Sequence, residues 1–311
     1  MIAEPSFSPD VVSRDRGLSI AGLQESLTRP QTLATRSLWA AMYPDHPYGR
    51  ASTEASLGSL TKALVHGFHS RFWRPERMTA TIVGDVSEAE ALSLLNAVTA
   101  LIGRTPAEAA GPATAQTAGA TSSQAVQWLD LLPAVGPGQP GQKTIAHPAK
   151  QSHIWLGAPM MSRRDRDDYF HMLVANHILG GGGFTARLTT EVREKRGLSY
   201  SVFSAFQPLA QTGPFLIGLQ TQRERANEAL AVVQATLKEF VEKGPSPEEL
   251  EAAKKNLMGG FALRLDSNRK LLDNLAQIGF YRLPLDYLDR WSARVEAVNA
   301  EEIQDVLRRR L

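Results

Sequence analysis

Arg193 and Tyr200 are two hydrogen-bond donors that lie seven residues apart, shortly after a run of four glycines, Gly180–Gly183. A guanidinium and a phenol both keep their protons near neutral pH. Aimed at one point, they suit a carbonyl oxygen that gains negative charge during acyl transfer. Glycines allow a backbone to approach an extended ligand such as a peptide closely. Taken alone, these residues allow a peptide site, but they favour the plainer interpretation of an arginine paired with a surface carboxylate, a half-buried strand tyrosine and a flexible loop.

A helix, a tight turn and a strand are needed to bring these two donors together. Apolar residues recur at helical spacing after the glycines, which predicts one amphipathic helix over Phe184–Arg196. Gly197 follows two basic residues, as at many helix ends. Residues 198–206 alternate and are rich in Tyr, Val and Phe, which predicts a strand. Arg193 would then lie in the last helical turn and Tyr200 at the start of the strand.

Composition excludes several classes of function. The chain has 311 residues, a net charge of +2 and no cysteine. The charge gives no electrostatic case for nucleic acid, and no apolar run has the length of a membrane span. Disulfides and thiolate zinc sites are excluded, and the compartment cannot be inferred from cysteine usage. The first ten residues lack the basic start and long apolar stretch of a signal peptide.

The remaining elements follow from periodicity and capping signals. In the first third we expect helices over 9–27, from Pro30, over 60–72 and over 87–102, with a strand over 78–83. In the second half we expect strands over 143–147, 151–157 and 215–221 and helices over 167–179, 223–243, 247–265, 269–281 and 285–298.

A compositional break divides the chain. From Thr105 to Gln124, 19 of 20 residues are Ala, Gly, Pro, Ser, Thr or Gln, which is typical of a linker. We therefore predict a partial first domain over 1–103, a linker over 104–142 and a second domain over 143–311 that carries Arg193 and Tyr200.

An internal repeat relates the two predicted domains. Ser8-Pro9-Asp10 opens one helical series, and Ser246-Pro247-Glu248 opens a similar series 238 residues later. The expected fold is α+β, a tandem repeat of two similar domains, each an antiparallel-rich sheet covered by helices. The second copy has about 103 residues before its Ser-Pro and the first has 7. We expect the first domain to be truncated at its N-terminus, with the natural start upstream of Met1.

The segment GGGGFTARLTTEVREKRGLSYSVFSAF, with HPYG, IVGDV and QSHIWLGAP, resembles the pitrilysin family of zinc metallopeptidases, which includes insulysin and the mitochondrial processing peptidase. The resemblance covers about residues 1–100 and 143–311. It implies two chains that close around an unfolded peptide, one of which carries zinc on an H-x-x-E-H helix. The other supplies an arginine and a tyrosine, here Arg193 and Tyr200. Its glycine loop binds substrate, and the residues concerned here are Gly180, Gly181, Gly182, Gly183 and Phe184.

The metal motif of that family is absent from the 311 residues. Its place in the second copy is His177-Ile178-Leu179-Gly180-Gly181, with glycines where the acid and second histidine would be. The family's third zinc ligand would align with Gly22, and Glu25 lies nearby. We therefore predict no metal site in this chain and expect zinc on a homologous partner chain.

Three histidines are further candidates. His66 and His69 share a helix face and could share a metal, but no third ligand is spaced to join them. His153 lies in an expected edge strand that could accept a substrate as an added strand. An ordinary solvent-facing histidine is an equal alternative.

We interpret the chain as the zinc-free subunit of a heterodimeric bacterial zinc peptidase, inactive alone, which binds unfolded peptide and supplies Arg193 and Tyr200. One alternative is a peptide-binding or structural scaffold without a catalytic role. Another is an active zinc peptidase whose zinc-binding half lies outside this sequence.

Overall fold

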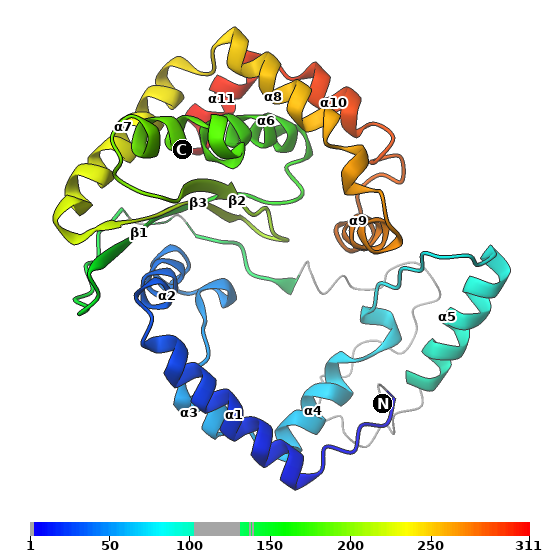
Figure 1. Cartoon of the computed structure of the whole chain (residues 1–311). Coiled ribbons are helices and arrows are strands. Elements are labelled where there is room, and N and C mark those ends of the chain that lie inside the picture. The colour runs from blue at the N-terminus through cyan, green and yellow to red at the C-terminus, as the bar shows by residue number, and fades with distance from the viewer. Residues whose placement is uncertain (1–2, 103–130, 137, 139) are drawn as a thin grey trace. The chain divides into compact units, whose positions relative to one another are not determined.

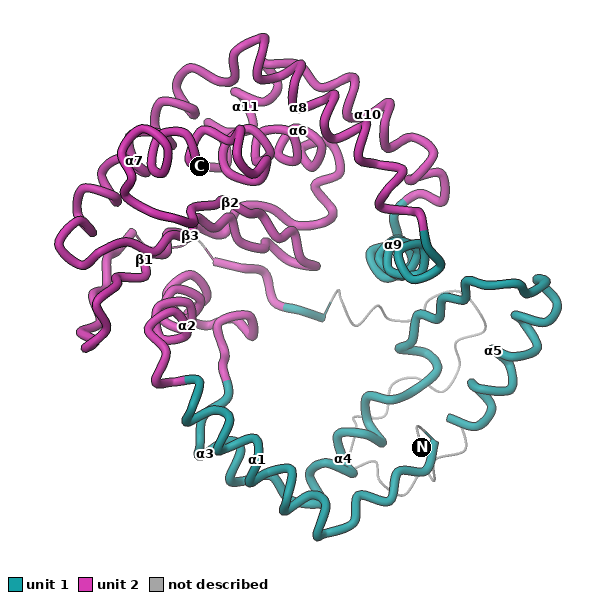
Figure 2. Tube along the Cα trace, viewed as in Figure 1, with its two compact units in different colours: residues 1–26, 52–132, 267–283 teal, residues 27–51, 133–266, 284–311 magenta. Residues whose placement is uncertain are grey.

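The computed structural model describes residues 3–102, 131–136, 138 and 140–311 (Figure 1). The chain divides into two compact units, and each unit is built from three stretches of sequence (Figure 2). Unit 1 comprises residues 1–26, 52–132 and 267–283, and unit 2 comprises residues 27–51, 133–266 and 284–311. Of the predicted linker over 104–142, residues 104–130, 137 and 139 lie outside the described residues.

Unit 2 contains a three-stranded antiparallel sheet in the order β1-β3-β2. The strands are β1 (Gln151–Met161), β2 (Val202–Phe206) and β3 (Gly213–Gln222). In register, Gly218 of β3 lies between Trp155 of β1 and Phe203 of β2. The central strand is therefore β3, and β1 and β2 are the two edges.

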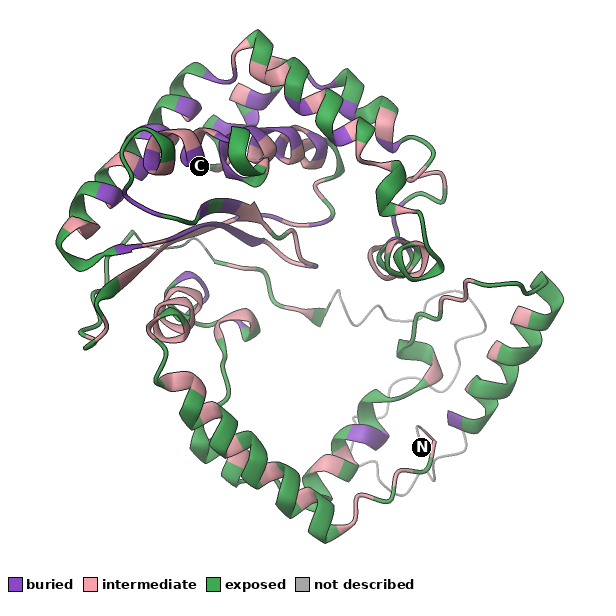
Figure 3. Ribbon diagram, viewed as in Figure 1, coloured by how far each residue is buried: buried purple, intermediate pink, exposed green. Residues whose placement is uncertain are grey.

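One face of this sheet is covered by helices and holds the main core (Figure 1). The helices of this layer are α6 (Arg166–Asn176), α7 (Ala226–Lys243), α8 (Pro247–Gly259), α10 (Trp291–Ala297) and α11 (Ala300–Arg310). Ile217 and Leu219 point from β3 into this core because successive strand side chains alternate between faces. Buried residues of unit 2 gather between the sheet and these helices (Figure 3). Ile303 of α11 belongs to the same cluster and is fully buried.

The other face of the sheet is partly covered by α2 (Pro30–Met42), which belongs to the same unit. Met42 and Leu38 pack toward Leu216 of β3 in a smaller cluster. A Cβ at Gly157 of β1 would lie 2.9 Å from the sulfur of Met42 and from a methyl of Leu216. Glycine at this position therefore permits the close approach of helix and strand.

Among its described residues, the regular elements of unit 1 are helices joined by irregular segments. Its helices are α1 (Pro9–Leu27), α3 (Glu54–Gly58), α4 (Lys62–Phe72), α5 (Glu88–Ile102) and α9 (Asn268–Tyr281). Ser87 and Glu90 exchange capping hydrogen bonds at the start of α5, as the serine predicted. Residues 78–83 are not a strand, so that prediction is wrong. A strand requires a neighbour for its hydrogen bonds, and the described part of unit 1 offers none.

Three other boundaries differ from the expected ones. Residues 143–147 form no strand, although Arg223, just after β3, holds the end of this stretch by donating to the carbonyls of His147 and Ala149. The predicted helix over 285–298 begins only at Trp291, after a series of turns. The predicted helix over 247–265 ends at Gly259 and is followed by a short 3₁₀ turn.

The helix starts follow the predicted repeat. Helix α2 begins at Pro30 and α9 at Asn268, while α4 begins at Lys62 and α11 at Ala300, so both pairs are 238 residues apart. The chain is an α+β protein with repeated helical series, as predicted. No helix in the described ranges is both long and apolar enough to cross a membrane.

Candidate functional site

The glycine run begins inside one π-helical segment and ends before a second. Helix α6 continues into a π-helix over His177–Gly181, and a second π-helix covers Thr189–Glu194. π-Helices are rare and are often found at functional sites. Between them, Gly183 has φ of +70° and starts a 3₁₀ turn over Gly183–Thr185. The single helix predicted over 184–196 is therefore wrong at its start, because the left-handed glycine turns the chain before Phe184 can join it.

Two of the glycines are required by close contacts with other side chains and strands. A Cβ at Gly180 would collide with the backbone nitrogen of Ser204 in β2. A Cβ at Gly181 would lie 2.5 Å from the side-chain nitrogen of Asn176. The hydroxyl of Ser204 donates to the Oδ1 of Asn176 at 2.8 Å, which ties the strand to the π-helix. The glycine run is thus a packed part of the fold.

Arg193 and Tyr200 meet as the sequence predicted. The central guanidinium carbon of Arg193 lies 4.7 Å from the ring centre of Tyr200 and 5.0 Å from that of Phe184. Both rings are open to solvent, with 79% of Tyr200 and 70% of Phe184 exposed. Tyr200 precedes β2, which begins only at Val202, so the predicted strand over 198–206 is shorter than expected.

These side chains line a pocket of about 430 Å³. Its lining residues are Gly180, Gly181, Gly183, Phe184, Thr189, Arg193, Tyr200, Ser201, Val202, Phe203 and Ser204. Arg193 is the charged member of this set. Within the described residues its guanidinium has no hydrogen bond and no ion pair. The pocket therefore combines exposed aromatic rings, close backbone and an unneutralised cation, which suits an extended chain with acceptor oxygens.

Gly182 differs from the other three glycines, because it does not line this pocket. A Cβ at Gly182 would lie 2.5 Å from the carbonyl oxygen of His177 and 3.1 Å from its Nε2. Gly182 therefore packs back onto the π-helix that precedes it. Glycine is needed at this position for the close packing against His177, and the expectation that all four glycines approach the substrate stays a prediction.

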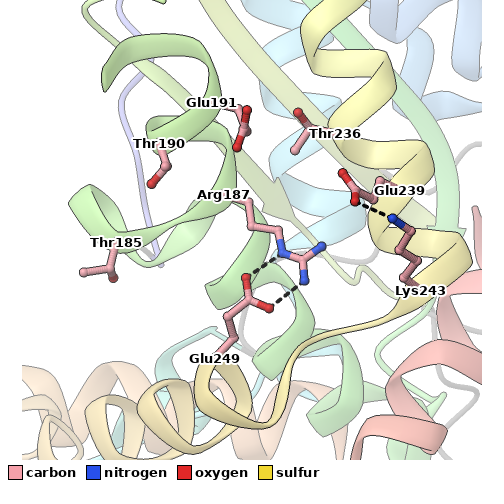
Figure 4. A pocket seen from close by; sticks show the side chains of 8 residues that line it. All are labelled: Thr185, Arg187, Thr190, Glu191, Thr236, Glu239, Lys243 and Glu249. Carbon is pink, nitrogen blue, oxygen red and sulfur yellow. Dashed lines mark hydrogen bonds and ion pairs between the residues drawn. The ribbon is translucent and has the colours of Figure 1, made fainter. Parts of the chain in front are cut away.

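A second hollow of about 280 Å³ lies between the same helical segment, α7 and the start of α8 (Figure 4). Here Arg187 donates two hydrogen bonds to Glu249, of 2.6 and 2.5 Å, and a third to the carbonyl of Gly244 at 3.0 Å. Lys243 pairs with Glu239 at 2.8 Å. The ion pair between Arg187 and Glu249 therefore clamps the segment that carries Arg193 onto the start of α8.

His153 does not join Arg193 and Tyr200. It lies on β1, opposite Gln220 of β3, and β3 separates β1 from β2. Burial, and secondarily the charge of His147, lowers the pKa of His153 below its usual value. Because β1 is an edge of the sheet, as predicted, His153 marks a second edge rather than part of the arginine pocket.

The residues at the expected zinc-motif position do not fit zinc. His177 is half-buried, and burial, followed by the nearby Arg264, lowers its pKa. Gly180 and Gly181 have no room for the acid and histidine that would complete the motif. Within the described ranges, no group of three His, Asp or Glu side chains could hold a metal ion. His69, the other candidate, is buried and stacks on Trp73 with ring centres 6.0 Å apart.

Sequence reasoning missed two features of the site. Trp155 and Phe203 meet edge to face at 5.7 Å, and both approach Gly218, where a Cβ would lie 2.9 Å from Phe203. A glycine inside a predicted strand is the signal that could have indicated this close packing. The ion pair between Arg187 and Glu249 joins residues 62 apart in the sequence, and no local sequence pattern indicates it.

Comparison with known proteins identifies the family. The profile of the peptidase M16 inactive domain matches residues 59–257, more than half of the chain. The chain belongs to the peptidase M16 family. A crystal structure of a peptidase M16 inactive domain from Pseudomonas fluorescens matches with a TM-score of 0.87 and 31% identity, covering 100% of this chain and 69% of that one. The resemblance to inverted zinc metallopeptidases is thereby confirmed.

Curated relatives in this family have longer sequences. An uncharacterised zinc protease of Mycobacterium tuberculosis is 27% identical over 293 residues, which cover 90% of this chain and 60% of the relative. A protein of Helicobacter pylori named non-peptidase homolog YmxG is 31% identical over 170 residues, covering 54% of this chain and 38% of the relative. The chain thus spans about three fifths of the length of the first of these relatives.

Proposed function

We propose that this chain is the zinc-free member of a two-chain M16 peptidase. It binds unfolded peptide and lends Arg193 and Tyr200 to hydrolysis at a zinc centre on a homologous partner chain. The two side chains orient the substrate and donate hydrogen bonds to the carbonyl oxygen that becomes negatively charged. The zinc chemistry belongs to the partner, because the glycines beside His177 leave no room for ligands here.

One observation carries this proposal: the unpaired guanidinium of Arg193 stacks on Tyr200 in a glycine-lined pocket. A structural arginine is normally satisfied by a carboxylate or carbonyl, as Arg187 is. Arg193 keeps its donors available within the described fold, and the exposed phenol of Tyr200 lies beside them. Donors arranged before a ligand arrives are the requirement for stabilising developing charge without reorganisation.

The two sheet edges suggest where a peptide would lie. Gly180 lies against β2, and Gly183 leaves open space where a side chain would otherwise stand. Phe184 offers an exposed ring beside it. At the opposite edge, β1 with His153 could pair with an extended segment through main-chain hydrogen bonds.

Substrate binding is therefore divided among the candidate residues according to their surroundings. The pocket-lining residues contact the peptide directly, and they are Gly180, Gly181, Gly183 and Phe184. Gly182 belongs to the same substrate-binding loop and packs it against His177. His153 belongs to the second edge.

The decisive experiment reconstitutes the chain with a zinc-bearing M16 partner and measures cleavage of an unfolded fluorogenic peptide. Tyr200→Phe should lower turnover by about 10²–10³, the typical effect of losing one such donor, while leaving the fold unchanged. Tyr281→Phe, which removes a hydroxyl from α9 in unit 1, is the matched control and should cleave normally. Equal rates for wild type and Tyr200→Phe would reject the catalytic role and leave a peptide-binding scaffold.

A second candidate follows from the relatives titled zinc protease, since this chain spans only part of their length. In that case the complete natural protein would hold zinc itself. Zinc content and peptide cleavage of the complete protein, purified without a partner, separate the two candidates. Stoichiometric zinc together with cleavage would overturn the two-chain proposal.

A further inference from the structure

The guanidinium of Arg193 lies close to two aromatic rings. Phe184 and Tyr200 lie at 5.0 and 4.7 Å from its central carbon, so aromatic rings occupy its neighbourhood. Cation–π contacts of this kind use the face of the guanidinium and leave its N–H groups free. Five N–H donors therefore remain for a ligand, and a planar acceptor with two oxygens matches them.

The hydroxyl groups of the pocket divide into used and unused donors. Thr189 donates to the carbonyl of Gly183 at 2.9 Å, and Ser204 donates to Asn176 at 2.8 Å. The hydroxyls of Tyr200 and Ser201 have no partner within the described part of the chain. An incoming group would thus meet one cation and two free hydroxyls.

No carboxylate is among the described residues that line the pocket, so none neutralises this cation there. Glu191 lies on the same short helix, but it pairs with Lys195 at 2.6 Å and Arg196 at 2.7 Å. Hydrogen bonds from these two cations outweigh the effect of partial burial and lower the pKa of Glu191. Glu191 is therefore paired with cations outside the pocket, and the pocket keeps the positive charge of Arg193.

We infer that this pocket selects peptides that place a carboxylate against Arg193, either an acidic side chain or a C-terminal carboxylate. The inference rests on the proposed peptide binding and specifies its substrate class. A neutral peptide carbonyl accepts from Arg193 through one oxygen only. A carboxylate accepts two parallel charge-assisted hydrogen bonds, which are roughly twice as strong as neutral ones. Ser201 supplies a further donor to the same group, while Tyr200 and the remaining N–H groups of Arg193 stay available for the scissile carbonyl.

The test uses the full chain and four fluorescent peptides of one unfolded sequence, with binding measured by anisotropy at low salt. The first has a central Glu and an amidated C-terminus, the second a central Gln and a free C-terminus, the third Gln with an amide, and the fourth Lys with an amide. At least one of the first two should bind about tenfold or more tightly than the third, as expected for a charge-assisted bidentate pair. Whichever does so identifies the source of the carboxylate.

Variants connect the preference to the pocket. Arg193→Gln should remove it, so that the acidic and neutral peptides bind alike. Arg193→Lys keeps the charge but loses the planar fork, so only part of the preference should remain. Arg269→Gln makes the same charge change on α9, where Arg269 already pairs with Asp273. This control should keep the full preference.

The outcomes are distinguishable. Equal binding of the four peptides would overturn the carboxylate preference and leave peptide binding intact. A preference that survives in Arg193→Gln would overturn it as well, because the carboxylate would then bind elsewhere. If no peptide binds to the wild-type chain, both this inference and the peptide-binding function are wrong.

Discussion

Two arginines six residues apart on one helical segment lie in opposite situations. Arg187 stacks on Phe240 at 4.7 Å, and Arg193 stacks on Phe184 at 5.0 Å. Phe240 is completely buried, whereas 70% of Phe184 is exposed. Arg187 has three hydrogen bonds to Glu249 and the carbonyl of residue 244, while Arg193 has none within the described residues. The same pair of residue types therefore forms a clamp on one side and an open site on the other.

The difference indicates that Arg187 serves the stability of this unit, whereas Arg193 is available for binding. A partly buried arginine must be paired, because an unsatisfied charge away from water is costly. An exposed arginine can remain unpaired because water solvates it until a ligand arrives. The clamp fixes the helical segment onto α8, and the free guanidinium is thereby held in a defined place. Substitution of Arg187 should consequently reduce the stability of the fold, and substitution of Arg193 should reduce peptide binding.

Truncating the two phenylalanines should give the largest contrast. We expect Phe240→Ala to destabilise the fold by about 3–5 kcal/mol, because it leaves a cavity in the core. Phe184→Ala should change the free energy of unfolding by less than about 0.5 kcal/mol, as for other exposed positions. Urea unfolding followed by tryptophan fluorescence measures both. Similar losses for the two variants would show that Phe184 also serves the core.

The arginines themselves should give the next largest effect. Arg187→Met leaves Glu249 unpaired and should cost about 2–3 kcal/mol, below the value for a fully buried pair because solvent screens the exposed part. Arg193→Met breaks no ion pair and should leave the unfolding midpoint within experimental error. Its peptide binding should fall instead. A destabilised Arg193→Met variant would mean that this arginine is structural.

Local signals in the sequence located most helices of the repeat. Ser246 caps α8 through a capping box with Glu249, and Asn299 does the same for α11 with Glu302. Such caps involve residues three apart, so the sequence contains the whole interaction. The meeting of Arg193 with the tyrosine seven residues later was predictable for the same reason, since only a helix end and a turn separate them.

Features that depend on distant partners were not predictable. Glu249 serves two interactions at once, and the sequence indicates the cap but not Arg187. The four glycines look alike in the sequence, and only the contact with His177 separates Gly182 from the pocket-lining members. A local run of one residue type therefore located the loop but did not assign a role to each position within it.

Repeat position alone does not fix burial either. Val306 is 1% exposed, yet Phe68, which lies 238 residues earlier, is 60% exposed. The two positions have the same place in their helices. Only the elements packed around them decide whether an apolar side chain is covered.

The dependence of stability on acid pH should show the smallest and most selective difference between the two arginines. Burial alone would raise the pKa of Glu249, but hydrogen bonds from Arg187 and from the Ser246 N–H outweigh it and hold the pKa below its usual value. A carboxyl with a lowered folded pKa stabilises the fold fully above its unfolded pKa of about 4.3. That contribution is lost as the pH falls through the folded pKa.

The unfolding midpoint of the wild-type chain should therefore decrease below about pH 4.3, with part of the decrease due to Glu249. Glu249→Gln should be less stable at neutral pH and show a shallower acid decrease, because one titrating group is gone. Arg187→Met should also show a shallower decrease of the unfolding midpoint in acid, since the hydrogen bonds that lower the pKa of Glu249 are lost. Arg193→Met should follow the wild-type curve throughout, because its guanidinium stabilises no carboxylate of the described fold. An acid dependence that changed in Arg193→Met but not in Arg187→Met would reverse the assignment of clamp and open site.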